Sequence, residues 1–204
     1  RHKKQSGGAG QFAEVRMRIE GKPRGDGVEF VHSLVGQNVD RVFVPSVEKG
    51  VTAACTEGVL AGYSVVDVKA DFYDGKQHPV DSKDIAFQMA GKQAFREAFM
   101  QAQPCLLEPI LNIEIKVPEE FMGDVMGDMS SRRGKIMGMD TEGTFQLIKA
   151  QAPQSEMYHY STTLRSLTGG RGIHSEKFSH YEEVPKEMEV KVIAESKISQ
   201  EEEL

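Results

Sequence analysis

The feature that most constrains the fold is an ordered series of hydrophobic patterns within residues 106–183. Segment 111–117 (LNIEIKV) has an apolar side chain at every second position, which is typical of a half-buried strand. A helical pattern opens at Pro118 and ends at Gly134, with acidic residues in its first turn and arginines in its last. Two strands about a turn at 141–143, a helix ended by glycines and a last strand follow. This order predicts an α+β unit of the ferredoxin-like, split βαβ type.

The preceding segment, 1–105, predicts a second unit with a different order of elements. Residues 11–20 alternate between apolar and charged side chains, as in a half-buried strand. A further strand is predicted within 28–36, and another within 63–75 has the inward row Val66, Val68, Ala70 and Phe72. The change of pattern places the domain boundary near residues 104–108.

Two helices are predicted among these strands. The first covers 44–58, with Ser46 as its N-cap and Gly58 as its terminator. The second covers 82–103, with Asp81 or Ser82 as its cap. Its expected buried stripe consists of Ile85, Met89, Ala90, Phe95 and Phe99.

Composition sets limits on the class of protein. A chain of 204 residues with 39% hydrophobic residues is long enough for one large domain or two small ones. The formal net charge of -6 does not favour a nucleic-acid binder, although such a contact needs only a local basic patch. Two isolated cysteines indicate a reducing compartment, so a cytoplasmic location is expected.

The two ends of the chain carry further expectations. The start, RHKKQSGGAG, is basic but lacks the apolar run of a signal peptide, and no apolar run is long enough to span a membrane. The absence of an initiating methionine indicates an excised fragment. The tail, 184–204, is expected to begin as a helix after Pro185 and to end as a mobile acidic segment.

No stretch offers a complete catalytic or metal site. The glycine-rich SGGAGQ, residues 6–11, lacks the lysine and the strand-to-helix context of a phosphate-binding loop, so a flexible turn is the better interpretation. Four of the other histidines have no visible partners and are expected at the surface or in the core: His32, His159, His174 and His180. The chain by itself is therefore expected to bind no cofactor or metal and to catalyse nothing.

Basic residues cluster at the ends of the two helices of the 106–183 unit. They are Arg132, Arg133, Lys135, Arg165 and Arg171. Two interpretations stay open for the arginines that follow the first helix: compensation of the helix dipole, or contact with a phosphate. The second basic helix end, in the same unit, makes an anion site the more favoured hypothesis.

The loop DGKQHPVDS, residues 74–82, places His78 between a strand and a helix. No cysteine, close serine or second histidine offers it a nucleophile or a metal-ligand set. Its function has to be inferred from the rest of the chain.

Long stretches of the sequence resemble one family, the translational GTPase elongation factor G and its paralogues, and specifically its fourth and fifth domains. The resemblance covers the chain to about residue 185. It rests on KQSGGAGQF (4–12), VPSVEKG (44–50), LAGYSVVDV (60–68), HPVDSKDIAF (78–87), LLEPILNIEIKVPEE (106–120), GDVMGDMSSRRGKIMGM (123–139) and LRSLTGGRG (164–172).

The resemblance implies a fold for each unit and a different function for each domain of the full-length protein. It implies that 1–105 is like domain IV, a tip domain that mimics transfer RNA and has a left-handed βαβ crossover, and that 106–183 is like the ferredoxin-like domain V. GTP and Mg²⁺ would be bound by domains outside this chain. The implied partners are the ribosome, at its decoding and factor-binding regions, and the tRNA–mRNA complex. The resemblance also implies that the protein is a monomer and does not bind a membrane.

The resemblance also implies which residues contact RNA. His78 falls on the family's tip histidine, and an imidazole there can stack on a base or donate to a phosphate or 2′-hydroxyl. The tip contacts implied by the two adjacent loops are Gly7, Gly8, Gly10, Gln11, Lys76, Gln77 and His78. The basic helix ends, Arg132, Arg133, Lys135, Arg165 and Arg171, resemble the surface that meets large-subunit ribosomal RNA.

Three departures from the family pattern affect the tip. Ala9 stands where the family usually has arginine, Pro79 stands where an acidic residue is usual, and residues 38–41 replace a loop usually written with glycine and proline. These changes indicate a divergent, elongation-factor-G-like paralogue. Translocation, ribosome recycling, ribosome protection against an antibiotic, and RNA binding by a free-standing module all stay open as functions.

Overall fold

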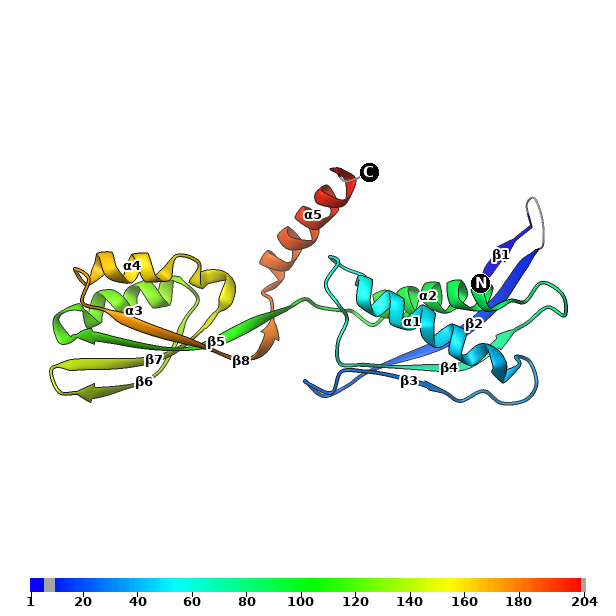
Figure 1. Cartoon of the computed structure of the whole chain (residues 1–204), viewed down its shortest axis with the longest axis horizontal. Helices are drawn as coiled ribbons and strands as arrows, with labels where there is room; N and C mark the ends of the chain where they lie inside the picture. Colours follow the sequence, from blue (N-terminus) through cyan, green and yellow to red (C-terminus); the bar gives the residue numbers. More distant parts are fainter. Residues whose placement is uncertain (6–9, 203–204) are drawn as a thin grey trace. The chain divides into compact units, whose positions relative to one another are not determined.

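The computed structural model describes residues 1–5 and 10–202, and the chain divides into two compact units. Unit 1 comprises 1–104 together with 189–204, and unit 2 comprises 105–188. Each unit contains a four-stranded sheet with two helices over one face (Figure 1). The chain is therefore an α+β protein with two sheets.

The sheet of unit 1 has the strand order β1-β2-β4-β3. Strand β2 is antiparallel to both of its neighbours, whereas β3 is parallel to β4. Parallel neighbours need a crossover connection, and helix α1 lies within it. The bounds of the strands are His2–Lys4 (β1), Gln11–Gly21 (β2), Val28–His32 (β3) and Val68–Lys76 (β4).

Alternation in the sequence predicted the buried face of this sheet well. Ala13 and Val15 of β2, and Ala70 and Phe72 of β4, are buried beneath the helices. The prediction that Val66 belongs to the same row is wrong, because β4 begins only at Val68 and Val66 is exposed.

Asp67, just before β4, explains why the strand begins late. Its backbone has φ 57°, in the left-handed region, and its carboxylate accepts N–H groups from Gly25 and Gly27 at 3.0 and 3.1 Å. Arg24 Nη1 donates to the same carboxylate at 3.0 Å. Burial by itself raises the pKa of Asp67, but these hydrogen bonds outweigh burial and lower it. Asp67 thus anchors the loop between β2 and β3.

Helix α1, Val44–Glu57, lies where it was predicted, but its cap differs. Phe43 is its N-cap, and the predicted cap, Ser46, lies inside the helix. The Ser46 hydroxyl instead donates to Asp84 Oδ1 of helix α2 at 2.9 Å. The predicted terminator is confirmed, because Gly58 has φ 75° and its N–H donates to the carbonyl of Ala54.

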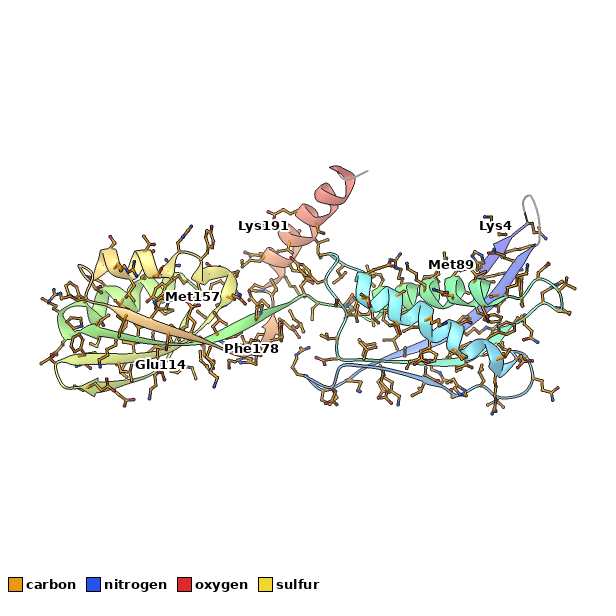
Figure 2. All side chains as sticks on the ribbon, in the orientation of Figure 1. Lys4, Met89, Glu114, Met157, Phe178 and Lys191 are labelled. Carbon is orange, nitrogen blue, oxygen red and sulfur yellow. The ribbon has the colours of Figure 1, made fainter. Side chains whose placement is uncertain are left out.

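Helix α2, Asp84–Gln101, begins later than predicted, and neither Asp81 nor Ser82 caps it. Its N-cap is Lys83, which makes no side-chain capping bond. Ala90 and Phe95 are buried as predicted, and the rest of the buried face of α2 consists of Ala86, Phe87 and Gly91. Ile85 and Met89 are exposed, and Figure 2 labels Met89 on α2.

The two helices of unit 1 meet at two glycines. A Cβ built on Gly50 of α1 would lie 2.1 Å from the carbonyl oxygen of Gln88. A Cβ built on Gly91 of α2 would lie 3.0 Å from the Val47 carbonyl oxygen. The close approach of α1 and α2 therefore requires glycine, which has no side chain, at both positions.

Unit 2 has the predicted order of elements and an entirely antiparallel sheet, β6-β7-β5-β8. This is the ferredoxin-like arrangement, because the first strand of the unit lies between the third and the last. The short 3-10 helices η2 (Glu119–Phe121) and η3 (Gln154–Met157) precede the α-helices. The bounds are Leu107–Pro118 (β5), Met122–Ser131 (α3), Lys135–Glu142 (β6), Phe145–Pro153 (β7), Tyr160–Leu167 (α4) and Ile173–Glu183 (β8).

The core of unit 2 is formed where the alternating face of β5 meets the helices. The four predicted inward residues of β5 are buried together with Val125 and Met129 of α3. Pro118 differs from its prediction, since it ends β5 and caps η2 and does not open α3.

Helix α5, Lys186–Glu202, follows Pro185 as predicted. The helix continues through Glu202, so the expectation that the acidic end leaves the helix is wrong over this range. No helix in the described part of the chain is long and apolar enough to cross a membrane. Cys55 is a buried thiol, and burial raises its pKa to about 11.

Candidate nucleic-acid interface

Three segments meet at one end of unit 1 and form what we call the loop cluster: residues 10–12, 38–41 and 76–82. The Phe12 N–H donates to the Asp81 carbonyl at 2.9 Å. The Asp40 N–H donates to Oε1 of Gln77 at 2.7 Å. The segment of residues 76–82 is thus joined to both of the others.

His78 is the first residue of a closed turn within this cluster. Its carbonyl accepts the Ser82 N–H at 3.3 Å, and its own N–H donates to the Ser82 hydroxyl at 2.8 Å. The imidazole Nδ1 accepts the N–H groups of Val80 and Asp81 at 3.3 and 3.2 Å. We refer to residues 78–82 as the His78 turn.

Pro79 occupies the second position of the His78 turn. Proline suits this position because its ring fixes φ near the value that the turn requires. Its missing N–H is not needed, since the next two residues supply the donors that the imidazole accepts. The departure from the usual acidic residue is therefore compatible with an ordered turn.

The His78 turn leaves its polar groups accessible. The His78 side chain is 51% exposed, and its ring meets the Phe12 ring edge-on at 6.3 Å between centroids. The adjacent Lys76 is exposed, and its side chain makes no hydrogen bond or close ion pair with a described residue. An ammonium group at the end of β4 and an imidazole two residues further along the chain are thus both accessible.

The other predicted tip residues are placed differently. Gln77 is occupied by its bond to Asp40, and Gln11 pairs with His2 Nε2 at 2.8 Å. Gly10 lies so close to the turn that an added Cβ would be 2.8 Å from the Asp81 carboxylate. Gly7, Gly8 and the departure Ala9 lie outside the described residues.

Sequence reasoning missed strand β1 beside the loop cluster. It carries Lys3 and Lys4, both exposed and without a side-chain partner among the described residues; Figure 2 labels Lys4. The basic run RHKK was the signal that could have found them. Three residues are too few to show a strand period, so the element itself could not be predicted.

In unit 2, Arg132 has partners inside the unit. Its guanidinium donates to Asp128 Oδ2, to the Glu156 carbonyl and to Thr163 Oγ1 at 2.9, 2.6 and 3.1 Å. It also lies 5.1 Å from the centroid of the buried Tyr160 ring. Only 17% of the side chain is exposed, so Arg132 links the end of α3 to the start of α4.

Arg133 also contacts unit 2 itself. It forms a forked pair with the carboxylate of the buried Glu108, and this hydrogen bonding raises the pKa of Arg133. Its backbone has φ 59°, a conformation that arginine rarely adopts. Arg133 thus connects the end of α3 to β5, because Glu108 lies in β5.

The remaining basic residues are more exposed. Lys135 lies 3.8 Å from Glu182, and Arg171 pairs with Glu120 at 2.8 Å and lies over the Phe121 ring at 4.6 Å. Arg165 is exposed in the last turn of α4 and has no side-chain partner in the described part of the chain.

The structure does not bring the two basic helix ends of unit 2 together. Arg132 brings the end of α3 to the start of α4, whereas Arg171, after α4, meets Glu120 just before α3. The helices are therefore antiparallel, and their basic ends lie at opposite ends of the pair.

Three of the other histidines have local contacts. His174 pairs with Glu176 at 3.0 Å, His180 pairs with Glu182 at 2.8 Å, and the ring of His159 lies 3.9 Å from that of Tyr158. His32 is exposed at the end of β3. Within residues 1–5 and 10–202, no group of three or more metal-ligating side chains is placed to hold an ion.

Comparisons with known proteins follow the same division into two units. The family model described as elongation factor G, domain IV, matches residues 1–103, and that described as elongation factor G C-terminus matches 105–192. The chain belongs to the elongation factor G family. Its relatives include elongation factor G of Aquifex pyrophilus, which is 52% identical over 192 residues.

The similarity extends to solved structures but covers only part of each relative. A crystal structure of a Thermus thermophilus protein has 38% identity and a TM-score of 0.80, covering 96% of this chain and 29% of that chain. The Aquifex alignment covers 94% of this chain and 28% of that protein. The chain thus spans less than a third of these relatives and corresponds to domain IV and the C-terminus of an elongation factor of translation.

Proposed function

We propose that the chain is the ribosome-contacting C-terminal part of a cytoplasmic translation factor that promotes GTP-dependent movement of tRNA and mRNA. The observation that carries this proposal is the identity of 52% with elongation factor G along 94% of the chain. The loop cluster supports it, because His78 and Lys76 expose a ring and a cation at one end of unit 1.

The loop cluster is the part that meets the decoding region of the small subunit. The Lys76 ammonium neutralises a phosphate, and the His78 imidazole donates to a backbone oxygen or stacks on a base. By filling the position that tRNA and mRNA leave, the cluster prevents their return. The tRNA–mRNA complex and ribosomal RNA are therefore the proposed partners of a monomeric factor.

Unit 2 meets the factor-binding region of the large subunit through its exposed cations. Lys135, Arg165 and Arg171 are the proposed contacts, since their side chains lie largely in solvent. For Arg132 and Arg133 we propose a role inside unit 2 in place of the RNA contacts that the resemblance predicts, because both guanidiniums have partners within the unit.

GTP and Mg²⁺ belong to other domains of the full-length protein in this proposal. The chain itself has no GxxxxGK[ST] sequence to hold phosphates and a magnesium ion. We expect the chain to show no micromolar binding of a GTP analogue in calorimetry, and such binding would reveal a nucleotide site within it.

A second candidate function has the same fold but acts at a step other than translocation. The departures at Pro79 and residues 38–41 favour a paralogue that recycles or protects ribosomes, since both lie in the loop cluster. Complementation of a translocase-depleted translation system by the full-length protein decides between them: restored synthesis supports translocation, and failure with retained ribosome splitting or antibiotic release supports the alternative.

His78→Ala in the full-length protein tests the part played by the loop cluster. We expect GTP cleavage to stay within about twofold, while mRNA movement slows by about 10- to 100-fold, since a charged-group hydrogen bond contributes about 1.5–3 kcal/mol. Single-turnover measurements that follow the two steps separately give the answer. If movement matches that of the unmutated protein, His78 is not a contact.

A further inference from the structure

The His78 turn contains a second residue, Ser82, whose hydroxyl joins the turn to strand β2. The oxygen accepts the His78 N–H at 2.8 Å, and the hydroxyl donates to the Phe12 carbonyl at 2.7 Å. One hydroxyl can make both bonds because it has one donor and two acceptor positions. The Phe12 N–H donates back to the Asp81 carbonyl at 2.9 Å. Ser82 therefore couples the backbone of His78 to β2.

The hydrogen bonds of the imidazole determine which nitrogen carries the proton. Backbone N–H groups can only donate, so Nδ1 of His78 must accept from Val80 and Asp81. A neutral imidazole then carries its proton on Nε2. No described residue hydrogen-bonds to Nε2, so the Nε2–H is the group left for a partner.

The surroundings of Nδ1 are consistent with this tautomer. The two backbone N–H groups meet the ring at the same nitrogen, and the Asp81 carboxylate lies 3.6 Å from it. The geometry of the turn therefore leaves the Nε2 edge of the ring as the donor.

We propose that Ser82 is a positioning residue, which holds His78 as an Nε2–H donor toward an acceptor oxygen of an RNA backbone. Phosphate and 2′-hydroxyl oxygens share this acceptor chemistry. The RNA part of the proposal rests on the proposed function of the loop cluster, whereas the tautomer and its dependence on Ser82 belong to the chain alone.

Nitrogen NMR of the ¹⁵N-histidine-labelled 204-residue chain tests the tautomer without a ribosome. At about pH 8.5, where histidine is neutral, we expect His78 to show an unprotonated Nδ1 and a protonated Nε2. The resonance is assigned by its loss in His78→Gln. A protonated Nδ1, or shifts equal to those of a free histidine peptide, would overturn the proposal.

Variants of Ser82 test the positioning. Ser82→Ala should move the His78 shifts toward those of the free peptide, and Ser82→Thr, which keeps the hydroxyl, should restore them. Ser64→Ala is the matched control, because the one partner of its exposed hydroxyl among the described residues is the Thr56 carbonyl, at 3.4 Å. Unchanged His78 shifts in Ser82→Ala would show that Ser82 does not position the ring.

Ribosome binding then tests the RNA part separately. Ser82→Ala should weaken pelleting of the chain with ribosomes by about the same factor as His78→Ala, and the double variant should lose no more, because both changes remove one contact. Additive losses would overturn the coupling. If the unmutated chain does not pellet at all, the proposed function fails. The NMR result still tests the tautomer of His78 and its dependence on Ser82.

Discussion

The loop cluster of unit 1 and the helix ends of unit 2 use similar polar side chains in opposite ways. In the loop cluster, backbone groups and one hydroxyl satisfy each other, so Lys76 and one edge of His78 are left accessible. At the end of α3, Arg132 and Arg133 are instead bound to carbonyl and carboxylate groups of the same unit. A basic cluster in a sequence can therefore indicate either a ligand contact or a set of stabilising contacts within the domain.

The largest effect should come from removing the ion pair between Arg133 and Glu108 within unit 2. Arg133→Ala leaves the carboxylate of the buried Glu108 without its forked partner, so the free energy of unfolding should fall by about 3 kcal/mol. Lys135→Ala is the control, because its 3.8 Å ion pair is exposed and should contribute less than about 1 kcal/mol. Urea unfolding of both variants measures the difference in the free energy of unfolding. Equal losses would show that the Arg133 ion pair stabilises unit 2 no more than an exposed one.

Unit 1 should respond most to a change of backbone spacing. Gly50→Ala puts a Cβ against the carbonyl of Gln88, and overpacking of this kind costs about 1–3 kcal/mol. Gly123→Ala in α3 is the matched control, since a Cβ there meets nothing within 4 Å and should be neutral or slightly stabilising. Thermal unfolding that finds Gly50→Ala neutral would show that α1 and α2 can separate freely.

Acid should weaken the Asp67 anchor. The pKa of Asp67 is lowered from 3.8 in the folded chain, so its contribution is present above 3.8 and is lost as pH falls through the lowered value. Asp67→Asn removes this part of the acid dependence and, at neutral pH, a stabilisation of about 1.5 kcal/mol. Unfolding curves from about pH 7 to 2 check this, and parallel pH profiles of variant and parent would contradict it.

The sequence predicted those parts of the fold that depend on one-sided burial. The alternation in β2, β4 and β5 and the order of elements in unit 2 were readable because each strand has one face in a core. Helix starts were not readable, because Ser46 and Ser82 use their hydroxyls for tertiary partners and not for the helix N-termini. Short-range capping signals cannot reveal such competition.

The candidate site was predictable only in part, for a related reason. The position of His78 in a loop after a strand followed from the pattern, but its bonds to Val80 and Asp81 depend on how the turn closes. The pairing of Arg133 with Glu108 joins residues 25 positions apart, which no local pattern shows. Exposure of a cation is thus a tertiary property.

The most direct test of the account is the salt dependence of ribosome binding by the 204-residue chain. Plotting the logarithm of affinity against that of salt concentration counts the phosphate contacts, and loss of one contact lowers the slope by about 1. Lys76→Ala should lower the slope by this amount, and Arg132→Ala, once circular dichroism confirms its fold, should leave it unchanged. A lower slope in Arg132→Ala together with an unchanged slope in Lys76→Ala would contradict the account.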